Sequence, residues 1–347
     1  MKTEIKIIEK EKILNDIDAL DTDLILVVVD SRVWQLYGKD FENKLPSQKN
    51  FILFKSLEGE KTKCFEEFES GLEFFLEKGI HRNAHLVAIG GGATSDFAGY
   101  IAASILRGIS WSIVPTTILS MVDASIGGKT GINSKHGKNL VGAFHMPDRV
   151  WIDDSFLSTL DRGEYKSGLG EILKYGFLDE NVTKLLEGET ALKKVIEACA
   201  KSKERIVQED FKESGVRISL NLGHTYGHAL EKIYDLSHGE AVFWGMALIF
   251  KLHHTKDEKN VQECLSYLRT WSKNLGVDFG DPPWLNKTFP VAKIMNYLSK
   301  DKKKASSGTV KIVKVKELGK FSTETISLES IKTNLEERAN ELRTFNF

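Results

Sequence analysis

The sequence has little cysteine and no long apolar run. Its three cysteines, Cys64, Cys199 and Cys264, stand far apart without a CxxC pair, which argues against a disulfide framework and for a reducing compartment. The longest apolar run, Leu24 to Val29, is far shorter than the ~20 residues needed to span a bilayer. The first residues mix both charge signs and contain no apolar signal core. We therefore expect a cytoplasmic protein with no membrane partner.

The sequence also lacks a charge excess. Its 48 Lys and Arg nearly balance 49 Asp and Glu, for a formal net charge of −1. No global field then favours nucleic acid, so we expect none as a partner, and an anionic ligand must be bound by a local basic cluster. The 347 residues, 41% of them hydrophobic, suffice for two domains with sizeable cores.

Hydrophobic patterning divides the chain near residue 161. Short apolar runs predict strands at 24–29, 51–55, 86–89, 112–114 and 149–152, and helical spacing predicts helices at 61–79 and 96–106. Strands alternating with helices indicate a largely parallel sheet. After residue 161, helical patterns dominate at 165–178, 189–209, 217–234, 239–255 and 290–300, with a short β-like stretch at 310–315.

The predicted fold class is therefore an N-terminal α/β domain followed by a mainly α-helical domain. We place the first domain at residues 1–161 and the second at residues 162–347. A boundary of this kind is a usual place for a ligand cleft.

A glycine triplet follows the strand predicted at 86–89. Gly90 to Gly92 lie between that strand and a helix, where bare backbone and a helix N-terminus can bind phosphate. The GxGxxG fingerprint is absent, and a tight turn explains the triplet equally well. Asp30, at the end of the first predicted strand, either accepts hydrogen bonds from a ribose or only ends that strand.

The stretch at 122–144 combines glycines with polar and basic side chains. Asp123, Lys129, Asn133, Lys138 and Asn139 stand among five glycines, a composition that suits an anion or phosphate site. The alternative is a solvated surface loop. The apolar end, residues 140–144, is expected to pack into the core, which favours the site.

Four polar residues recur at helical spacing near the middle of the second half. Arg217, Asn221, His224 and His228 are spaced four, three and four, so all fall on one face of the predicted helix 217–234. One such histidine is usually structural, but four polar residues in line favour a site. His224 and His228 are also close enough to share a metal.

Two other segments can complete a metal site. GLGEILKYG carries Glu171 and Lys174 on one helical face, and SHGEAV places His238 at a helix start. One Glu with two His is the ligand set of a catalytic zinc with open positions. Spacing alone leaves open whether the histidine pair is His224 and His228 or His224 and His238.

These motifs together resemble one known family. GGGATSDFAGYIAASILRG, VPTTILSMVDASIGGKTGINSKHGKNLVGAF, GEILKYG, LNLGHTYGHALE, HGEAVFWGM and DKK occur in this order. The chain resembles the 3-dehydroquinate synthases, within the sugar-phosphate cyclases, over roughly residues 30–303. The resemblance implies a dinucleotide-binding N-terminal domain, a helical C-terminal domain, an active site between them, and usually a homodimer.

The resemblance also implies the cofactors and their residues. The cofactors would be NAD and one divalent metal, zinc or cobalt, with the metal held by Glu171, His224 and His238. NAD contacts would fall on Asp30, Glu60, Lys63, Gly91, Gly92, Asp96, Thr116, Thr117, Lys138, Asn139 and Thr159. Substrate contacts would fall on Asp123, Lys129, Asn139, Lys174, Lys203, Glu213, Arg217, Asn221, His228 and Lys302, with Arg107 reaching the substrate phosphate across the dimer interface.

The implied reaction converts 3-deoxy-arabino-heptulosonate 7-phosphate to 3-dehydroquinate and phosphate, a step of aromatic amino acid biosynthesis. Transient oxidation at C5 by NAD acidifies the C6 proton and allows β-elimination of phosphate. Re-reduction regenerates NAD, and an intramolecular aldol closes the ring. His228, with Asn221, is expected to transfer the proton at the oxidised hydroxyl.

Other functions compete with this one. Another sugar-phosphate cyclase, acting on an aminated substrate or on sedoheptulose 7-phosphate, is the nearest. A metal-dependent polyol dehydrogenase would accumulate NADH and typically uses Asp in place of Glu171. A catalytically silent relative would lack a ligand or a catalytic lysine, and this sequence lacks neither.

Overall fold

The computed structural model describes residues 3–44, 48–253, 258–300 and 308–345. The chain divides into two compact units. Unit 1 comprises Met1–Asp161 with Lys203–Gln208, and unit 2 comprises Arg162–Ser202 with Glu209–Phe347.

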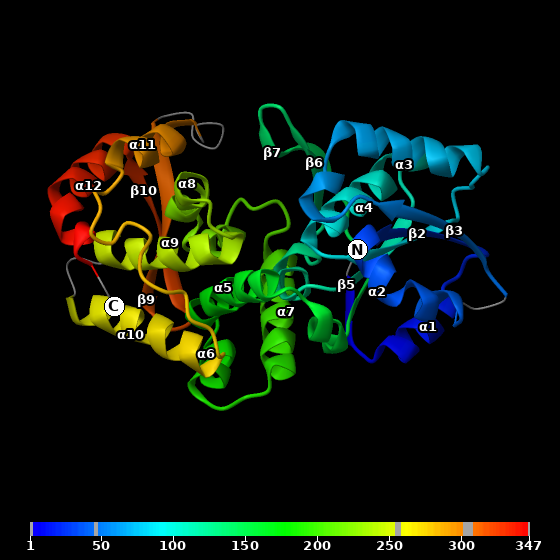
Figure 1. Ribbon diagram of the computed structural model, residues 1–347, viewed down its shortest axis with the longest axis horizontal. Coiled ribbons are helices and arrows are strands. Elements are labelled where there is room, and N and C mark those ends of the chain that lie inside the picture. The colour runs from blue at the N-terminus through cyan, green and yellow to red at the C-terminus, as the bar shows by residue number, and fades with distance from the viewer. Residues whose placement is uncertain (1–2, 45–47, 254–257, 301–307, 346–347) are drawn as a thin grey trace. The chain divides into compact units, whose positions relative to one another are not determined.

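Unit 1 is built on a parallel sheet, which in the described residues has six strands (Figure 1). In spatial order they are β1 (Glu4–Ile7), β8 (Arg149–Ile152), β5 (Ser110–Pro115), β4 (His85–Gly90), β2 (Leu24–Asp30) and β3 (Asn50–Ser56). Every residue of β2 and β4 is buried, because strands of a parallel sheet are covered on both faces. The five predicted strands are confirmed. The charged, half-exposed β1 has no apolar run and was not foreseen.

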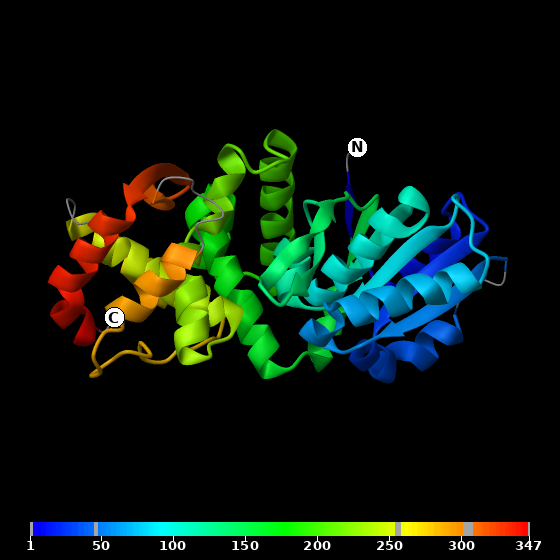
Figure 2. The same ribbon diagram turned by 90° about the horizontal axis from the view of Figure 1, so that it is seen from above.

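Helices cover both faces of this sheet (Figures 1 and 2). α1 (Lys10–Asp18) and α2 (Ser31–Glu42) lie on one side, and α3 (Phe65–Glu77) and α4 (Gly92–Ser104) lie on the other. Right-handed crossovers require this, because the chain moves outward from β2 to β3 and then returns past β2 to β4. The order therefore reverses between β2 and β4, where open parallel sheets bind ligands at their carboxyl edge.

The glycine-rich stretch forms a hairpin. β6 (Lys129–Ser134) pairs antiparallel with β7 (Gly137–Phe144) around a register shift. Our expectation that its apolar end packs into the core is wrong. Leu140 and Phe144 are 47% and 48% exposed, because a two-stranded ribbon buries one face at most.

Unit 2 is mainly helical, so the predicted fold class is confirmed. An antiparallel pair, β9 (Thr309–Glu317) and β10 (Lys320–Ser327), accompanies its helices. The helices are α5 (Arg162–Leu178), α6 (Glu180–Glu187), α7 (Leu192–Glu209), α8 (His224–Tyr234), α9 (His238–His253), α10 (Glu258–Asn274), α11 (Val291–Lys300) and α12 (Leu328–Arg343). Residues Lys203–Gln208 of α7 belong to unit 1. α6, α10, α12 and β10 were not foreseen as separate elements. No helix in the described ranges is long and apolar enough to cross a membrane.

The prediction of a single helix at 217–234 is wrong. A 3₁₀ helix, η5 (Val216–Asn221), ends before α8 begins, so Arg217 and Asn221 do not share the helical face of His224. Gly223 breaks the path with φ +81°, a conformation open mainly to glycine. A Cβ there would lie 2.6 Å from the carbonyl oxygen of Val242, so glycine also permits the close approach of α9.

Candidate functional site

Three side chains of unit 2 converge where α5, α8 and α9 meet. Glu171 projects from α5, while His224 and His238 are the first residues of α8 and α9. The Nε2 atoms of His224 and His238 lie 3.4 Å and 3.2 Å from the same oxygen, Oε1 of Glu171. One ligand atom from each residue lies within 4.8 Å of the others, an arrangement that could hold a metal ion. The structure thus groups His238, not His228, with the other two.

Close backbone contact between α5 and α9 sets this geometry. A Cβ on Gly170 would lie 2.2 Å from the carbonyl oxygen of Gly239, so any larger residue would separate the two helices. The backbone N–H of Gly239 also donates to Oγ of Ser167 at 3.1 Å. These neighbours fix Glu171 and His238 beside each other.

The Glu171 carboxylate is fully buried and forms an ion pair with the equally buried ammonium of Lys174, one helical turn later. Breaking a buried pair by removing one charge is strongly destabilising, so each charge stabilises the other. Lys174 therefore supplies positive charge directly beside the candidate metal ligands.

The two histidines differ in protonation. Burial lowers the pKa of His224 to about 3, and Lys174 adds to this, although Glu171 opposes it. Burial would also lower the pKa of His238, but hydrogen bonds to the carboxylates of Glu171 and Glu231 outweigh burial and raise that pKa to about 9. The two pKa values therefore shift in opposite directions, because only His238 has a carboxylate beside each ring nitrogen.

His228 lies beside this group, one turn along α8. Its ring centroid is 5.4 Å from that of His224 and 6.3 Å from that of His238. The three imidazole rings therefore lie close together, and the role of His228 in proton transfer stays a prediction.

A loop after α7 carries three further predicted residues. Asn221 Nδ2 donates to Oε1 of Glu213 at 2.8 Å, and Nη1 of the buried Arg217 donates to the carbonyl oxygen of Phe211 at 2.6 Å. Glu213 has φ +59°, which is rare for a residue with a side chain. These contacts bond Asn221 to Glu213 and tie Arg217 to the backbone of the same loop.

Asp210 organises this loop, and it was not among the predicted residues. Its carboxylate accepts the backbone N–H groups of Ser214 at 2.9 Å, Gly215 at 2.6 Å and Arg217 at 3.0 Å. The Ser214 hydroxyl donates to it as well, at 3.2 Å. These bonds lower the pKa of Asp210 although burial opposes them. The available signal was an Asp preceding a Ser-Gly turn, which is typical of loop capping.

The predicted ribose acceptor of unit 1 lies at the carboxyl edge of the sheet. Asp30 ends β2 and Gly90 ends β4, and these strands are neighbours. The Asp30 carboxylate accepts the backbone N–H groups of Arg32 at 2.8 Å and Gly59 at 2.9 Å. It therefore caps α2 and ties down the loop at Gly59. Its contact with a ribose stays a prediction.

Four predicted cofactor residues meet in one polar cluster of unit 1. Lys63 Nζ donates to Oδ2 of Asp96 at 2.6 Å and to Oδ1 of Asn139. Asn133 connects Glu60 to this group, because it donates to Oε1 of Glu60 at 2.8 Å and accepts the backbone N–H of Asn139 at 3.0 Å. Asn133 was noted in the glycine-rich stretch but not predicted as a contact.

The predicted threonines stabilise strand-end loops. The backbone N–H of Thr116 donates to the last residue of β4 at 2.9 Å, and Oγ1 of Thr117 accepts the N–H of Ser120 at 3.1 Å. Thr159 hydrogen-bonds the hydroxyl of Tyr37 on α2 at 2.6 Å. The predicted Gly91 and Gly92 lie at the start of α4.

The predicted basic residues of unit 1 fall into two groups. The buried Lys203 forms an ion pair with Asp123 at 3.0 Å, joining two predicted substrate contacts. Lys129, Lys138 and Arg107 are exposed instead, and Arg107 has φ +65°. The predicted Lys302 lies outside the described residues.

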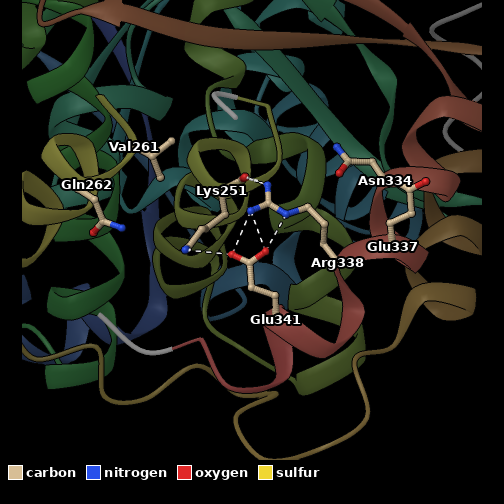
Figure 3. Close-up of a pocket in the computed structure, with 7 residues that line it drawn as sticks. All are labelled: Lys251, Val261, Gln262, Asn334, Glu337, Arg338 and Glu341. Atoms are coloured by element: carbon tan, nitrogen blue, oxygen red, sulfur yellow. Dashed lines mark hydrogen bonds and ion pairs between the residues drawn. The ribbon is translucent and has the colours of Figure 1, made fainter. Parts of the chain in front are cut away.

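A surface hollow among α9, α10 and α12 is a separate feature of unit 2 (Figure 3). Arg338 binds both carboxylate oxygens of Glu341 at 2.9 and 3.0 Å, and Lys251 pairs with Glu341 at 3.2 Å. Glu337 also lines the hollow, so its two positive and two negative charges balance and it is a poor match for an anionic substrate.

Solved structures define the class to which this fold and cluster belong. A 2-epi-5-epi-valiolone synthase from Streptomyces hygroscopicus subsp. jinggangensis 5008, with NAD+ and Zn2+ bound, has a TM-score of 0.81, 25% identity and 98% coverage of each chain. A 2-deoxy-scyllo-inosose synthase complexed with carbaglucose-6-phosphate, NAD+ and Co2+ has a TM-score of 0.79, 23% identity and 96% coverage of each chain. The chain thus has the fold of the sugar-phosphate cyclases.

Sequence comparison narrows this class to one family. The chain matches the family descriptions "3-dehydroquinate synthase N-terminal" over residues 53–167 and "3-dehydroquinate synthase C-terminal" over residues 168–304. The 3-dehydroquinate synthase of Staphylococcus aureus (strain JH9) is 36% identical over 342 residues, which cover 95% of this chain and 92% of that protein. The chain belongs to the 3-dehydroquinate synthase family.

Proposed function

We propose that the chain converts 3-deoxy-arabino-heptulosonate 7-phosphate to 3-dehydroquinate and phosphate, as a carbon–oxygen lyase that uses NAD and one divalent metal ion. Family membership supports the reaction. The single observation in the structure that supports it best is the convergence of Glu171, His224 and His238.

The residues present fit a divalent metal. With zinc–ligand distances of about 2.0–2.1 Å, the ligand atoms of a tetrahedral site lie about 3.3 Å apart. The observed separations from Oε1 of Glu171 are 3.2 and 3.4 Å. Three protein ligands leave a position for substrate, and the metal, when bound, supplies Lewis-acid activation of a substrate hydroxyl.

Unit 1 fits a dinucleotide. Gly91 and Gly92 place no side chain at the N-terminus of α4, where a Cβ on either would crowd Thr117 or Ala124 at 3.0 Å. A helix N-terminus binds a pyrophosphate well. The bound NAD+ of the valiolone synthase supports the same cofactor here, where it would supply reversible hydride transfer.

The chain's own residues supply charge and proton transfer. Arg217 and Lys174 would bind the anionic groups of the substrate, with Arg able to bind a carboxylate or phosphate through two hydrogen bonds. Glu213 and Asn221 would orient its hydroxyl groups, because they already bond each other at 2.8 Å. His228 would take the proton from the hydroxyl that is oxidised. Asp123, Lys129, Asn139, Lys203 and Lys302 remain predicted substrate contacts.

Phosphate release from 3-deoxy-arabino-heptulosonate 7-phosphate tests this function. Purified protein with NAD and zinc is expected to release phosphate and form dehydroquinate in equal amounts, without net NADH. Chelation of the metal should abolish release, and added zinc should restore it. Net NADH would point to a dehydrogenase instead. Release only from sedoheptulose 7-phosphate would point to a different cyclase.

The proposal extends to assembly and location. A cytoplasmic homodimer would let the exposed Arg107 serve the partner's substrate phosphate, as the family resemblance implies. Light scattering gives the mass in solution. Mixing an Arg107→Ala variant with a His228→Ala variant, each nearly inactive alone, should restore part of the activity if Arg107 acts across the interface.

A further inference from the structure

Glu231 lies in the last turn of α8, behind the candidate metal ligand His238. Its Oε2 is 3.3 Å from Nδ1 of His238, and its side chain is only 15% exposed. Nε2 of the same ring lies 3.2 Å from Glu171. The imidazole of His238 is therefore held between two carboxylates, one on each nitrogen.

His224 is held in a comparable way by a different group. Its Nδ1 lies 3.2 Å from the carbonyl oxygen of Leu222, while its Nε2 faces Glu171. A neutral imidazole has one N–H and one lone pair, so an acceptor at Nδ1 places the proton there and the lone pair on Nε2. Both rings therefore present Nε2 toward the same point.

The location of Glu231 has a local cost. The C-terminal turn of a helix carries partial negative charge, so a carboxylate in the last turn of α8 is unfavourable there. Lys232 offers only a distant pairing, at 3.9 Å, from a side chain that is 51% exposed. The closer and more buried interaction of Glu231 is with His238, and this interaction offsets the cost.

We propose that Glu231 is a positioning residue: it holds the Nδ1–H of His238 and thereby orients Nε2 for metal binding. This inference rests on the proposed metal site. Acceptors of this kind fix the tautomer and ring orientation of metal-binding histidines and strengthen their binding.

Glu240 provides a matched control on the neighbouring helix. It lies two residues after His238 and is similarly half-buried, but its carboxylate pairs with Lys166 at 2.5 Å and accepts from Ser237 at 3.0 Å. It has the same charge, without the contact to the imidazole that the described structure gives Glu231.

Zinc affinity, measured by competition with a coloured chelator at one pH, tests the inference. We expect Glu231→Ala to weaken zinc binding by about 10- to 100-fold. Glu231→Gln should lose less, because its amide oxygen can still accept from Nδ1–H, and Glu240→Gln should bind zinc like the wild type. The visible spectrum of cobalt-loaded Glu231→Ala should also differ from that of the wild type, since the ligand geometry changes.

Each other result overturns the inference in a recognisable way. Wild-type affinity in Glu231→Ala would show that His238 needs no such support. Equal losses in Glu231→Gln and Glu240→Gln would show a general effect of removing negative charge. If Glu231→Ala does not fold, the same comparison is made between Glu231→Gln and Glu240→Gln alone. Absence of zinc binding in the wild type would instead refute the metal site itself, and with it this inference.

Discussion

The two units build their candidate sites from different parts of the chain. In unit 1 the groups lie at strand ends and turns, where glycine backbone leads into the N-terminus of α4. In unit 2 the groups are side chains on helices, held in register by glycine contacts between α5 and α9. Backbone donors suit a phosphate-bearing cofactor, while rigid side chains suit a metal that demands fixed ligand distances.

Two buried histidines, one in each unit, have similarly lowered pKa values but different surroundings. Burial lowers the pKa of His85 in unit 1 to about 4, and that of His224 in unit 2 to about 3. His85 hydrogen-bonds the Ser112 hydroxyl at 2.8 Å, inside the sheet. His224 has its Nε2 3.4 Å from the Glu171 carboxylate and its ring 5.2 Å from that of His238. A perturbed pKa alone therefore does not separate a structural histidine from a functional one; the groups that it faces do.

Removal of a metal ligand should have the largest effect. Glu171→Gln is expected to reduce dehydroquinate formation by about 10³-fold or more, because metal activation is worth several kcal/mol. NAD binding, followed by fluorescence, should not change. The exposed Glu187→Gln serves as control. Retained activity in Glu171→Gln would show that the reaction does not need this candidate metal ligand, and unit 2 would no longer differ from unit 1 by holding a required metal.

A substitution in unit 1 should impair the binding of NAD and leave the binding of zinc unchanged. Gly91→Val places methyl groups where a Cβ already lies 3.0 Å from Thr117, so NAD affinity should fall by about 10- to 100-fold, as expected for 1–3 kcal/mol of steric strain. Zinc affinity should remain that of the wild type. A parallel loss of both ligands would mean that the variant unfolds or that the two sites are not independent.

His85 gives a stability prediction with a defined sign. Because its pKa in the folded protein is about 4, below the unfolded value of 6.5, its contribution is complete above pH ~6.5 and is lost as the pH falls toward 4. The loss amounts to roughly 3 kcal/mol. His85→Gln should flatten the urea-unfolding free energy over this window. An unchanged pH slope would show that other groups govern acid unfolding.

The smallest effect is expected at the loop after α7. Asp210→Ala removes the acceptor of three backbone N–H groups beside Arg217, so KM for the substrate should rise about tenfold, the usual cost of losing hydrogen bonds to a charged group. Zinc affinity should not change, and kcat should change less than KM. An equal fall in kcat with unchanged KM would contradict a role in positioning Arg217.

Patterns within single elements were predictable from the sequence. The buried run 24–29 forms β2, and helical spacing found α3 and α9, because local periodicity reflects one buried face. The break at Gly223 was not predictable, since its positive φ is required by the approach of α9, which is distant in sequence. The pairing of β9 with β10 was not predictable either, because β10 contains no apolar run.

The site shows the same limit. Spacing placed His224 and His228 on one face but could not show which histidine lies beside Glu171, because that depends on the contact between Gly170 and Gly239. Glu231 was open to prediction, since it stands seven residues after His224 on the same face of α8. Asp210 acts through backbone groups, which leave little trace in side-chain patterns.

Titration of metal-free protein with zinc, in the presence of NAD and 3-deoxy-arabino-heptulosonate 7-phosphate, tests the central claim most directly. The account predicts that dehydroquinate formation rises from near zero and levels off at one zinc per chain, and that Glu171→Gln shows no such rise. Full activity without metal, or a normal rise in Glu171→Gln, would contradict the claim that the helical unit holds the metal required for the reaction.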